Sequence, residues 1–327
     1  MKKKALITGI TGQDGSYLTE LLLKKKYQVH GLVRRVALED ENHRLWRLRH
    51  LLNKITLHPA SLESYASLVK IIQKIKPTEV YHLGAQSYVD YSFKDEFSTL
   101  NTNINGTHYI LSALKEFSPK SKFYFAGSSE MFGKVKETPQ TEKTPFYPRS
   151  VYGISKVAGY DLTRNYREAY NMYCCSGILF NHESPRRGFE FVTRKITHAV
   201  ARIKFGIQKE LKLGNIDAKR DWGHAADYVE AMWLMLNQRK PNDYVISTGK
   251  QFSVKDFAKL AFELVDLDYR KFVKIEKNLY RPSEVRSLLG DCRKAKKELK
   301  WKPKYDFKKL VKDMMTADLK FVEKEGY

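Results

Sequence analysis

Two polar motifs in the middle of the chain carry residues that could move protons. In the first, SVYGISK, Tyr152 and Lys156 stand four residues apart within a run typical of a helix. Residues at this spacing lie one above the other on the same helix face. An ammonium beside a phenol stabilises the phenolate, so we expect the pKa of Tyr152 to fall from about 10 towards working pH. Tyr152 is thus a candidate base for a sugar or alcohol hydroxyl. The same spacing also fits an exposed helical pair.

The second motif, GSSEMFG, supplies a hydroxyl and a carboxylate. Ser128 and Glu130 follow the apolar run KFYFA, which is typical of a buried strand. Ligands of parallel α/β sheets bind at the carboxyl ends of the strands, where this motif is expected to lie. A carboxylate next to a serine can act as a base and then as an acid on the same substrate. The alternative for Glu130 is an ordinary carboxylate at a strand end.

The elements that must position these residues alternate between strand and helix. Strands are predicted at 4–8, 28–33, 55–58, 79–83, 122–126 and 172–180. Helices are predicted at 16–25, 64–75, 102–117, around Tyr152, at 193–205 and at 225–238. The alternation predicts an α/β fold with a doubly wound parallel sheet. We expect a Rossmann-like domain with the catalytic residues at 1–180. The remainder, 181–327, is expected to be mainly a smaller substrate-binding region, with some segments returning to the first domain.

A glycine turn joins the first strand to the first helix. Gly9, Gly12 and Gly15 stand in TGITGQDG with the spacing G-x-x-G-x-x-G. Glycines allow the backbone to turn tightly and to approach a pyrophosphate, which then meets the amides at a helix N-terminus. Between a buried strand and an amphipathic helix, such a turn predicts a dinucleotide site.

The end of the second strand indicates which dinucleotide binds. An Asp or Glu there would accept a hydrogen bond from a free ribose 2′-hydroxyl. This chain instead has Arg34 and Arg35, whose guanidiniums suit a 2′-phosphate. The sequence therefore favours NADP over NAD. The alternative is that both arginines face solvent or a neighbouring subunit.

Composition narrows the class of protein. The 327 residues carry a formal net charge of +22, but Lys and Arg are spread along the chain among Glu and Asp. We therefore expect a basic solvated surface and no nucleic-acid partner. No apolar run is long enough for a bilayer, and MKKKALITG lacks the long apolar stretch of a signal peptide. The cysteines, Cys174, Cys175 and Cys292, are odd in number and show no metal-ligand spacing. We expect a reduced, cytoplasmic protein with no metal and no membrane partner.

Longer motifs resemble the GDP-mannose 4,6-dehydratase family of the extended short-chain dehydrogenase/reductase superfamily. The resemblance runs from residue 5 to about residue 302. It rests on TGITGQDGSYL, YHLGAQSYV, SSEMFGK, SVYGISK, NHESPRRG, FVTRKI and RDWGHAADYV. The glycine turn and Y-x-x-x-K are typical of the whole superfamily. NHESPRRG with FVTRKI and RDWGHAADYV is specific to the dehydratase branch.

The resemblance implies roles for individual residues. Those of the catalytic set fall on Ser128, Glu130, Tyr152 and Lys156. NADP contacts fall on Gly9, Gly12, Gln13, Asp14, Gly15, Arg34, Arg35, Leu62, Leu83, Ala85, Ser87, Tyr152, Lys156, His182 and Arg187. Contacts to the nucleotide sugar fall on Ser87, Asn181, Lys195, Arg220, Arg281 and Glu284. It also implies a homo-oligomer, dimer or tetramer, and a lyase of deoxysugar biosynthesis.

These residue types suggest a reaction sequence. Tyr152 takes the proton of the sugar C4 hydroxyl as hydride leaves C4 for NADP, while Ser128 binds the same oxygen. Lys156 orients the nicotinamide ribose. The resulting ketone acidifies the C5 hydrogen, which Glu130 removes before protonating the C6 hydroxyl, so that water departs. Return of the hydride to C6 gives a 4-keto-6-deoxy sugar.

The chain departs from the family in three places. Ser128 stands where the family has threonine, and Ser61-Leu62 stands where Asp-Leu is expected. The segment 36–52 does not match the family's serine-rich stretch, which helps form the tetramer and reaches a neighbour's cofactor. The role of 36–52 and the number of subunits stay open.

Alternatives remain for substrate and activity. GDP-mannose is the leading substrate, and a GDP-manno-heptose is the alternative because a carbon beyond C6 does not interfere with oxidation at C4. A 4-keto-sugar reductase or epimerase of the same fold would share Ser128, Tyr152 and Lys156 but would not need Glu130. A more distant alternative is a non-enzymatic NADP-binding or nucleic-acid-binding protein, which would have no use for the complete set.

Overall fold

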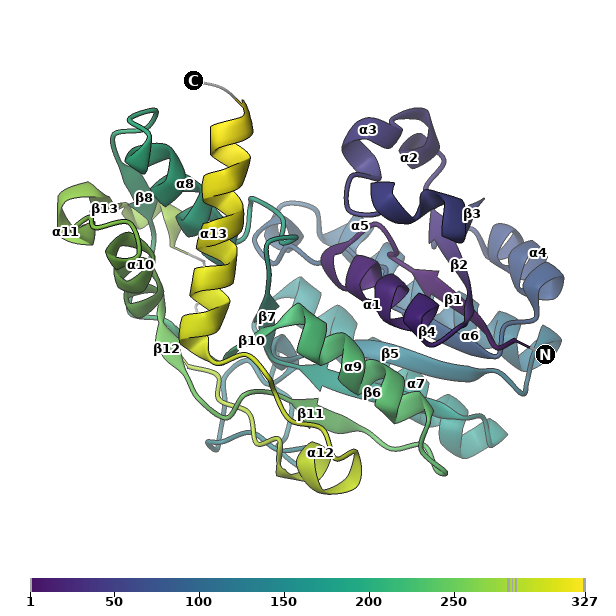
Figure 1. Ribbon diagram of the computed structural model, residues 1–327. Coiled ribbons are helices and arrows are strands. Elements are labelled where there is room, and N and C mark those ends of the chain that lie inside the picture. The colour runs from purple at the N-terminus through teal and green to yellow at the C-terminus, as the bar shows by residue number, and fades with distance from the viewer. Residues whose placement is uncertain (1, 281–282, 284, 286, 326–327) are drawn as a thin grey trace.

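The computed structural model describes residues 2–280, 283, 285 and 287–325. Its centre is a seven-stranded sheet in the order β11-β6-β5-β4-β1-β2-β3 (Figure 1), in which every neighbouring pair is parallel. The strands are β1 (Lys4–Thr8), β2 (Gln28–Val33), β3 (Thr56–Pro59), β4 (Glu79–His82), β5 (Lys122–Ser128), β6 (Cys174–Leu179) and β11 (Tyr244–Ile246). The predicted fold class is confirmed, and the carboxyl ends of these strands meet at one edge of the sheet.

Helices cover both faces of this sheet. One layer contains α1 (Gln13–Lys24), α9 (Ala225–Leu236) and α12 (Arg293–Glu298), and the other contains α4 (Tyr65–Ile75), α6 (Gly106–Phe117) and α7 (Val151–Tyr170). Side chains along β1 alternate between them: Ala5 and Ile7 pack in the core beneath α1, and Leu6 packs in the core beneath α4. The sheet is thus buried on both sides, which explains why its strands read as continuous apolar runs.

The helix predicted at 102–117 begins earlier and contains an irregular turn. Its parts are α5 (Glu96–Leu100), a π-helical turn η3 (Asn101–Asn105) and α6. Within that turn, the Asn103 side-chain amide donates to Gln86 O at 3.1 Å and to Ser155 Oγ at 2.9 Å, and its Oδ1 accepts from Gln86 N at 2.8 Å. Asn103 therefore joins the loop after β4 to helix α7.

The later part of the chain builds a smaller unit around a third core. Its helices are α8 (Val192–Lys204), α10 (Val254–Glu263), α11 (Tyr269–Phe272) and α13 (Phe307–Glu325). Its strand pairs are β7 (Asn181–Glu183) with β10 (Trp222–His224), β8 (Leu211–Leu213) with β13 (Val273–Ile275), and β9 (Lys219–Arg220) with β12 (Phe252–Ser253). Strand β11 and helices α9 and α12, also from this part, lie on the main sheet (Figure 1). The boundary at residue 180 stays a prediction.

Short segments complete the fold. Between β2 and β3 lie α2 (Val36–Glu39), α3 (Glu41–Arg44) and the 3₁₀ turn η1 (Arg49–Lys54). Further 3₁₀ turns are η2 (Tyr91–Phe93), η4 (Ser129–Met131) and η5 (Lys277–Leu279). Within the described ranges, no helix combines the length and the apolar character that a bilayer crossing requires.

Candidate active site

Strand β5 delivers Ser128 and Glu130 to the carboxyl edge of the sheet. Ser128 is the last residue of β5, opposite Leu179 of β6. Its Oγ accepts a hydrogen bond from Glu130 N at 3.2 Å, which starts the 3₁₀ turn η4. The backbone of Glu130 is thus bound to the serine, and the residue is only 9% exposed.

Helix α7 brings Tyr152 and Lys156 to the same edge. Ser150 caps the helix by accepting a hydrogen bond from Gly153 N at 3.0 Å. A Cβ at Gly153 would lie 2.8 Å from Glu130 O, so the close approach of α7 to the turn after β5 requires glycine. Lys156 Nζ donates to Ala126 O at 3.0 Å and further ties α7 to β5. The first two turns of α7 are therefore fixed against the end of β5.

Tyr152 does not have the lowered pKa that was expected from the sequence. Burial raises the pKa to about 12, against a hydrogen bond with Ser128 and the charge of Arg187, which lower it. Burial also lowers the pKa of the Lys156 ammonium to about 8. The expectation that Lys156 lowers the pKa of Tyr152 towards working pH is wrong. The ammonium lies 5.7 Å from the Tyr152 ring centre and donates to a backbone carbonyl, while the phenol is taken out of water.

A cavity of about 170 Å³ lies between the glycine turn and the catalytic residues. The close packing of the turn explains its glycines: Gly9 has φ 69°, and a Cβ at Gly15 would lie 2.4 Å from Gly9 O. Most of the predicted cofactor contacts line this cavity, namely Gly9, Gly12, Gln13, Asp14, Gly15, Leu83, Ala85, Ser87, Tyr152, Lys156, His182 and Arg187. This cavity lies at the N-terminus of α1, where free backbone amides suit a pyrophosphate.

Three predicted cofactor residues lie outside this cavity. Arg34 and Arg35 follow β2 and are exposed, and Arg35 Nε lies 3.0 Å from Glu39 Oε1 in a surface ion pair. They stand at the same edge of the sheet as the glycine turn, because Thr8 of β1 is opposite Leu32 of β2. Leu62 is half-buried, and its Cδ1 would be 3.1 Å from a Cβ at Gly84, so it supports the backbone behind the cavity.

The glycine turn is bound directly to the stretch NHESPRR. Gln13 Nε2 donates to His182 O at 3.0 Å, and Gln13 Oε1 accepts from Ser184 Oγ at 2.7 Å. Asp14 Oδ2 lies 2.7 Å from His182 Nε2, and His182 stacks on Tyr228 at 4.5 Å. Burial opposes the charged forms of this pair, but their attraction prevails: the pKa of Asp14 is lowered and that of His182 is raised.

The Asp14–His182 pair predicts a pH-dependent contribution to stability. Because the pKa of His182 is raised, its part is complete below the unfolded value of about 6.5 and is lost as pH rises through the folded value. The part of Asp14, whose pKa is lowered, is complete above about 3.9 and is lost as pH falls through the folded value. We expect Asp14→Asn to lower the free energy of unfolding by about 1–3 kcal/mol near pH 6 and by less near pH 9. Urea unfolding at the two pH values measures this, with the exposed Asp217→Asn as control. A loss that stays equal or grows at high pH would contradict the ion pair.

A second cavity, of about 250 Å³, adjoins the first. Of the predicted sugar-nucleotide contacts, Ser87, Asn181, Lys195 and Arg220 line it. Arg281 and Glu284 lie outside the described residues. Six residues line both cavities: Ser87, Ser128, Glu130, Tyr152, Asn181 and Arg187. The structure thus places Ser128, Glu130 and Tyr152 where a molecule in one cavity would meet a molecule in the other.

Sequence reasoning missed Glu183, a buried carboxylate in the wall of the second cavity. Glu183 is 2% exposed, and its Oε2 accepts from Thr193 Oγ1 at 2.6 Å and lies 3.1 Å from Arg187 Nε. The Arg187 guanidinium also lies 3.5 Å from the ring centre of Phe191. Among the residues that the structure describes, Arg187 is the only arginine that lines both cavities, and Glu183 orients it. The spacing of an acid and an arginine four residues apart in NHESPRR was the available signal.

A second missed residue, Arg47, comes from the divergent segment 36–52. Its Nε donates to Arg186 O at 2.7 Å and its Nη1 to Thr11 O at 3.4 Å. Burial lowers the pKa of this guanidinium to about 10, against the nearby charge of Glu190. Arg47 thus connects the glycine turn with the loop that carries Arg187. The sequence could not predict this role of Arg47, because both of its hydrogen-bond acceptors are backbone carbonyls, which any residue type provides.

Known sequences of a single family match nearly the whole chain. The sequence pattern of the family described as GDP-mannose 4,6 dehydratase matches residues 6–314. GDP-mannose 4,6 dehydratase 1 of Arabidopsis thaliana is 51% identical over 336 residues, covering 99% of this chain and 92% of that protein. The enzymes of that name from Homo sapiens and Vibrio cholerae are 47% and 45% identical, covering 97% and 100% of this chain and 92% and 96% of those proteins.

Solved structures share the fold at lower identity. A UDP-glucose 4-epimerase from Thermotoga maritima, solved with UDP-glucose, has a TM-score of 0.86 at 23% identity and covers 98% of this chain and 99% of its own. RMD from Pseudomonas aeruginosa, complexed with NADPH, has a TM-score of 0.81 at 22% identity and covers 98% of this chain and 100% of its own. At such identities the likeness shows a common architecture.

Proposed function

The chain belongs to the GDP-mannose 4,6-dehydratase family, as its motifs predicted, and we propose that it converts a GDP-manno sugar to the 4-keto-6-deoxy product. The observation that carries this proposal is the position of Ser128, Glu130 and Tyr152 in the walls of both cavities. A phenol as first base, a serine hydroxyl and a carboxylate as second base at that junction suit oxidation at one carbon and elimination at its neighbours. A reductase or epimerase would leave Glu130 without a task.

The family depends on a nicotinamide cofactor, and we infer that the cofactor is NADP. Arg34 and Arg35 lie beyond the end of β2, at the same edge of the sheet as the glycine turn, where NAD-binding chains carry an acid. The glycine turn, which lines the first cavity at the N-terminus of α1, would hold the pyrophosphate. When bound, NADP would accept hydride from sugar C4 and return it to C6.

Different residues at the junction of the two cavities would carry out the different proton transfers. Tyr152 would accept the proton of the C4 hydroxyl, and Ser128 would hydrogen-bond the same oxygen. Glu130 would take the C5 proton and pass a proton to the C6 hydroxyl, which leaves as water. When hydride returns to C6, C5 would take up one proton, which balances the proton that Tyr152 accepted from the C4 hydroxyl. The charge of Arg187, held by Glu183, favours the phenolate of Tyr152 and opposes the effect of burial on its pKa. Lys156, fixed by Ala126 O, would orient the nicotinamide ribose.

The diphosphate of the substrate is inferred from two basic side chains in the wall of the second cavity. Lys195 and Arg220 line it and would bind a diphosphate, and an arginine can do so through two parallel hydrogen bonds. The family points to guanine as the base, which makes GDP-mannose the leading substrate and a GDP-manno-heptose the alternative. Ser128, smaller by a methyl than the family's threonine, leaves slightly more room beside the reacting carbons.

Assembly and compartment are further parts of the proposal. We infer a homo-oligomer, dimer or tetramer, in which exposed apolar side chains would be covered. Phe97 on α5, 87% exposed, is the clearest of these. Cys174, Cys175 and Cys292 are buried free thiols, which supports a reducing compartment such as the cytoplasm.

The reaction predicts that NADP is used catalytically. With a small amount of NADP, GDP-mannose should lose one water per molecule, measured by mass spectrometry of the nucleotide sugar, while no NADPH accumulates in the absorbance of reduced nicotinamide. GDP-manno-heptose, dTDP-glucose and UDP-glucose are the comparison substrates. NADPH formed in step with product would indicate a simple dehydrogenase. Activity confined to dTDP- or UDP-glucose would contradict the guanine assignment.

A further inference from the structure

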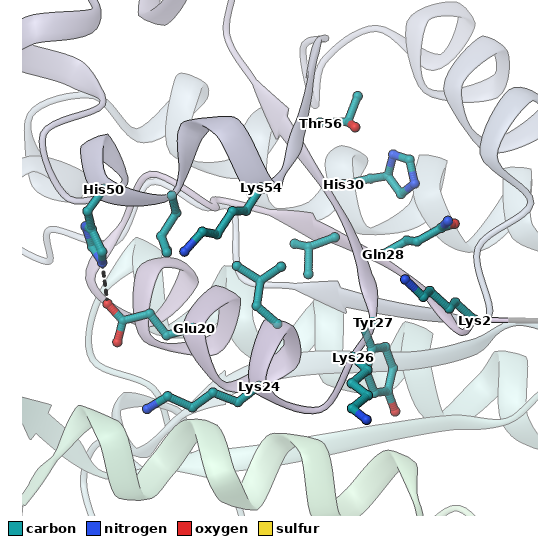
Figure 2. A pocket seen from close by; sticks show the side chains of 13 residues that line it. Lys2, Glu20, Lys24, Lys26, Tyr27, Gln28, His30, His50, Lys54 and Thr56 are labelled. Atoms are coloured by element: carbon teal, nitrogen blue, oxygen red, sulfur yellow. Dashed lines mark hydrogen bonds and ion pairs between the residues drawn. The ribbon is translucent and has the colours of Figure 1, made fainter.

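A broad groove of about 920 Å³ lies apart from both catalytic cavities (Figure 2). It runs over the amino ends of β1 and β2, lined by Lys2 before β1, by the end of α1, by Gln28 to His30 at the start of β2, and by η1. The catalytic residues stand at the carboxyl ends of the strands. At about 3.3 Å per residue, the length of β2 separates the two places. We call this cavity the basic groove.

The basic groove is rimmed by positive charge that no protein group neutralises. Lys2, Lys24, Lys26 and Lys54 line it, and none of their ammonium groups has a hydrogen-bond or ion-pair partner among the residues placed by the structure. The one carboxylate among its described lining residues is Glu20, and it is already engaged. Its Oε1 lies 2.7 Å from His50 Nε2 (Figure 2) and 2.6 Å from Arg186 Nη2. A polyanion in the groove would meet four free ammonium groups.

Between these lysines the floor of the basic groove is partly apolar. It is lined by Leu23, Val29, Leu51 and the ring of Tyr27, together with the polar side chains of Gln28, His30, His50 and Thr56. Cavities of several hundred Å³ that combine an apolar floor with a few charged groups are typical of small-molecule sites. The shape therefore suits a ligand with a flat, weakly polar body and a highly charged end.

Lys26 occupies a backbone position that favours glycine. Its φ is 64°, in the turn that ends α1, where Tyr27 N donates to Leu22 O at 3.0 Å. A glycine would adopt this left-handed conformation without strain. Lys26→Gly would therefore remove a charge from the rim of the basic groove without straining the backbone.

We propose that the basic groove binds a nucleoside diphosphate, with the lysines on the diphosphate and the apolar floor under the base. This site is separate from the sugar-nucleotide cavity of the proposed function, which Lys195 and Arg220 line. Inorganic pyrophosphate shares the charge of the ligand but not its body. A comparison of the two probes separates the role of the lysines from that of the floor.

The test is calorimetric titration of the full chain with GDP and with pyrophosphate, under saturating NADP so that the cofactor cavity is filled. We expect two GDP molecules per chain in the natural protein. Lys26→Gly should weaken the second by about tenfold, the scale of one charge-assisted contact. Lys24→Ala/Lys54→Ala should abolish it. Pyrophosphate should bind the groove more weakly than GDP.

The matched control is Lys76→Gly. Lys76 is also an exposed lysine with left-handed φ, 47°, at the end of a helix, but it does not line the basic groove. It loses the same charge and gains the same backbone freedom, so it should keep both GDP sites. Unfolding by urea should show that neither glycine variant is destabilised, and both should keep natural kcat/KM. A single GDP per chain in the natural protein, a second site that survives Lys24→Ala/Lys54→Ala, or equal affinity for pyrophosphate and GDP would each overturn the proposal.

Discussion

Tyr152→Phe is expected to stop the reaction before any hydride leaves the sugar. The substitution removes the hydroxyl that would accept the C4 proton and keeps the ring that fills the space at the start of α7. Loss of a general base at this step should lower turnover by about 10³-fold or more. A single-turnover mixture of protein, NADP and GDP-mannose should show neither reduced nicotinamide nor loss of water.

The control for this experiment lies on the same helix. Tyr160 OH donates to Asp243 Oδ2 at 3.2 Å, and Tyr160 lines neither catalytic cavity. Tyr160→Phe should therefore lower the free energy of unfolding by about 1 kcal/mol and leave turnover nearly unchanged. Reduced nicotinamide formed at the natural rate in Tyr152→Phe would remove Tyr152 from its proposed role.

Glu130→Gln should separate oxidation from elimination. The amide keeps the shape of the side chain in η4 but cannot take the C5 proton. Oxidation at C4 would proceed while water is retained, so overall turnover should fall by about 10²-fold or more. Reduced nicotinamide should then accumulate on the protein in a single turnover, which does not happen in Tyr152→Phe.

Glu137→Gln is the matched control, because this exposed carboxylate follows the same segment and lines neither cavity. It should behave as the natural protein in both assays. Loss of water at the natural rate in Glu130→Gln would show that another group removes the C5 proton.

The main sheet was predictable because its strands carry local signals. In β1 the run from Ala5 to Ile7 is apolar and is followed at once by the glycine turn, so type and boundary could both be inferred. β11 gave no such signal. It is three residues long, and its place beside β6 depends on pairing of Tyr244 with Gly177, far away in the chain. Short strands that return to a sheet are set by tertiary contacts, which a local pattern does not encode.

The candidate site shows the same division. Residue types and spacing predicted that Ser128, Glu130 and Tyr152 lie close together. The prediction was possible because the order of the elements places the end of β5 and the start of α7 at the same edge of the sheet. The pKa of Tyr152 could not be inferred in this way, since it depends on how much water the fold removes around the phenol. The π-helical turn at Asn103 was missed for a related reason: it is stabilised by bonds to Gln86 and Ser155.

The bonds between the glycine turn and NHESPRR have a consequence for how this family can diversify. Gln13 and Asp14 precede residue 180, whereas His182 and Ser184, which they contact, follow it. Recombination at residue 180 could join the first part of one relative to the second part of another. Gln13 and Asp14 would then come from one parent, and His182 and Ser184 from the other. A mismatch at any of them would leave a buried polar group unpaired beside the cofactor cavity, at a cost of about 1–3 kcal/mol. New substrate preferences in such a chain are therefore more accessible through substitutions in the cavity wall than through exchange of its two halves.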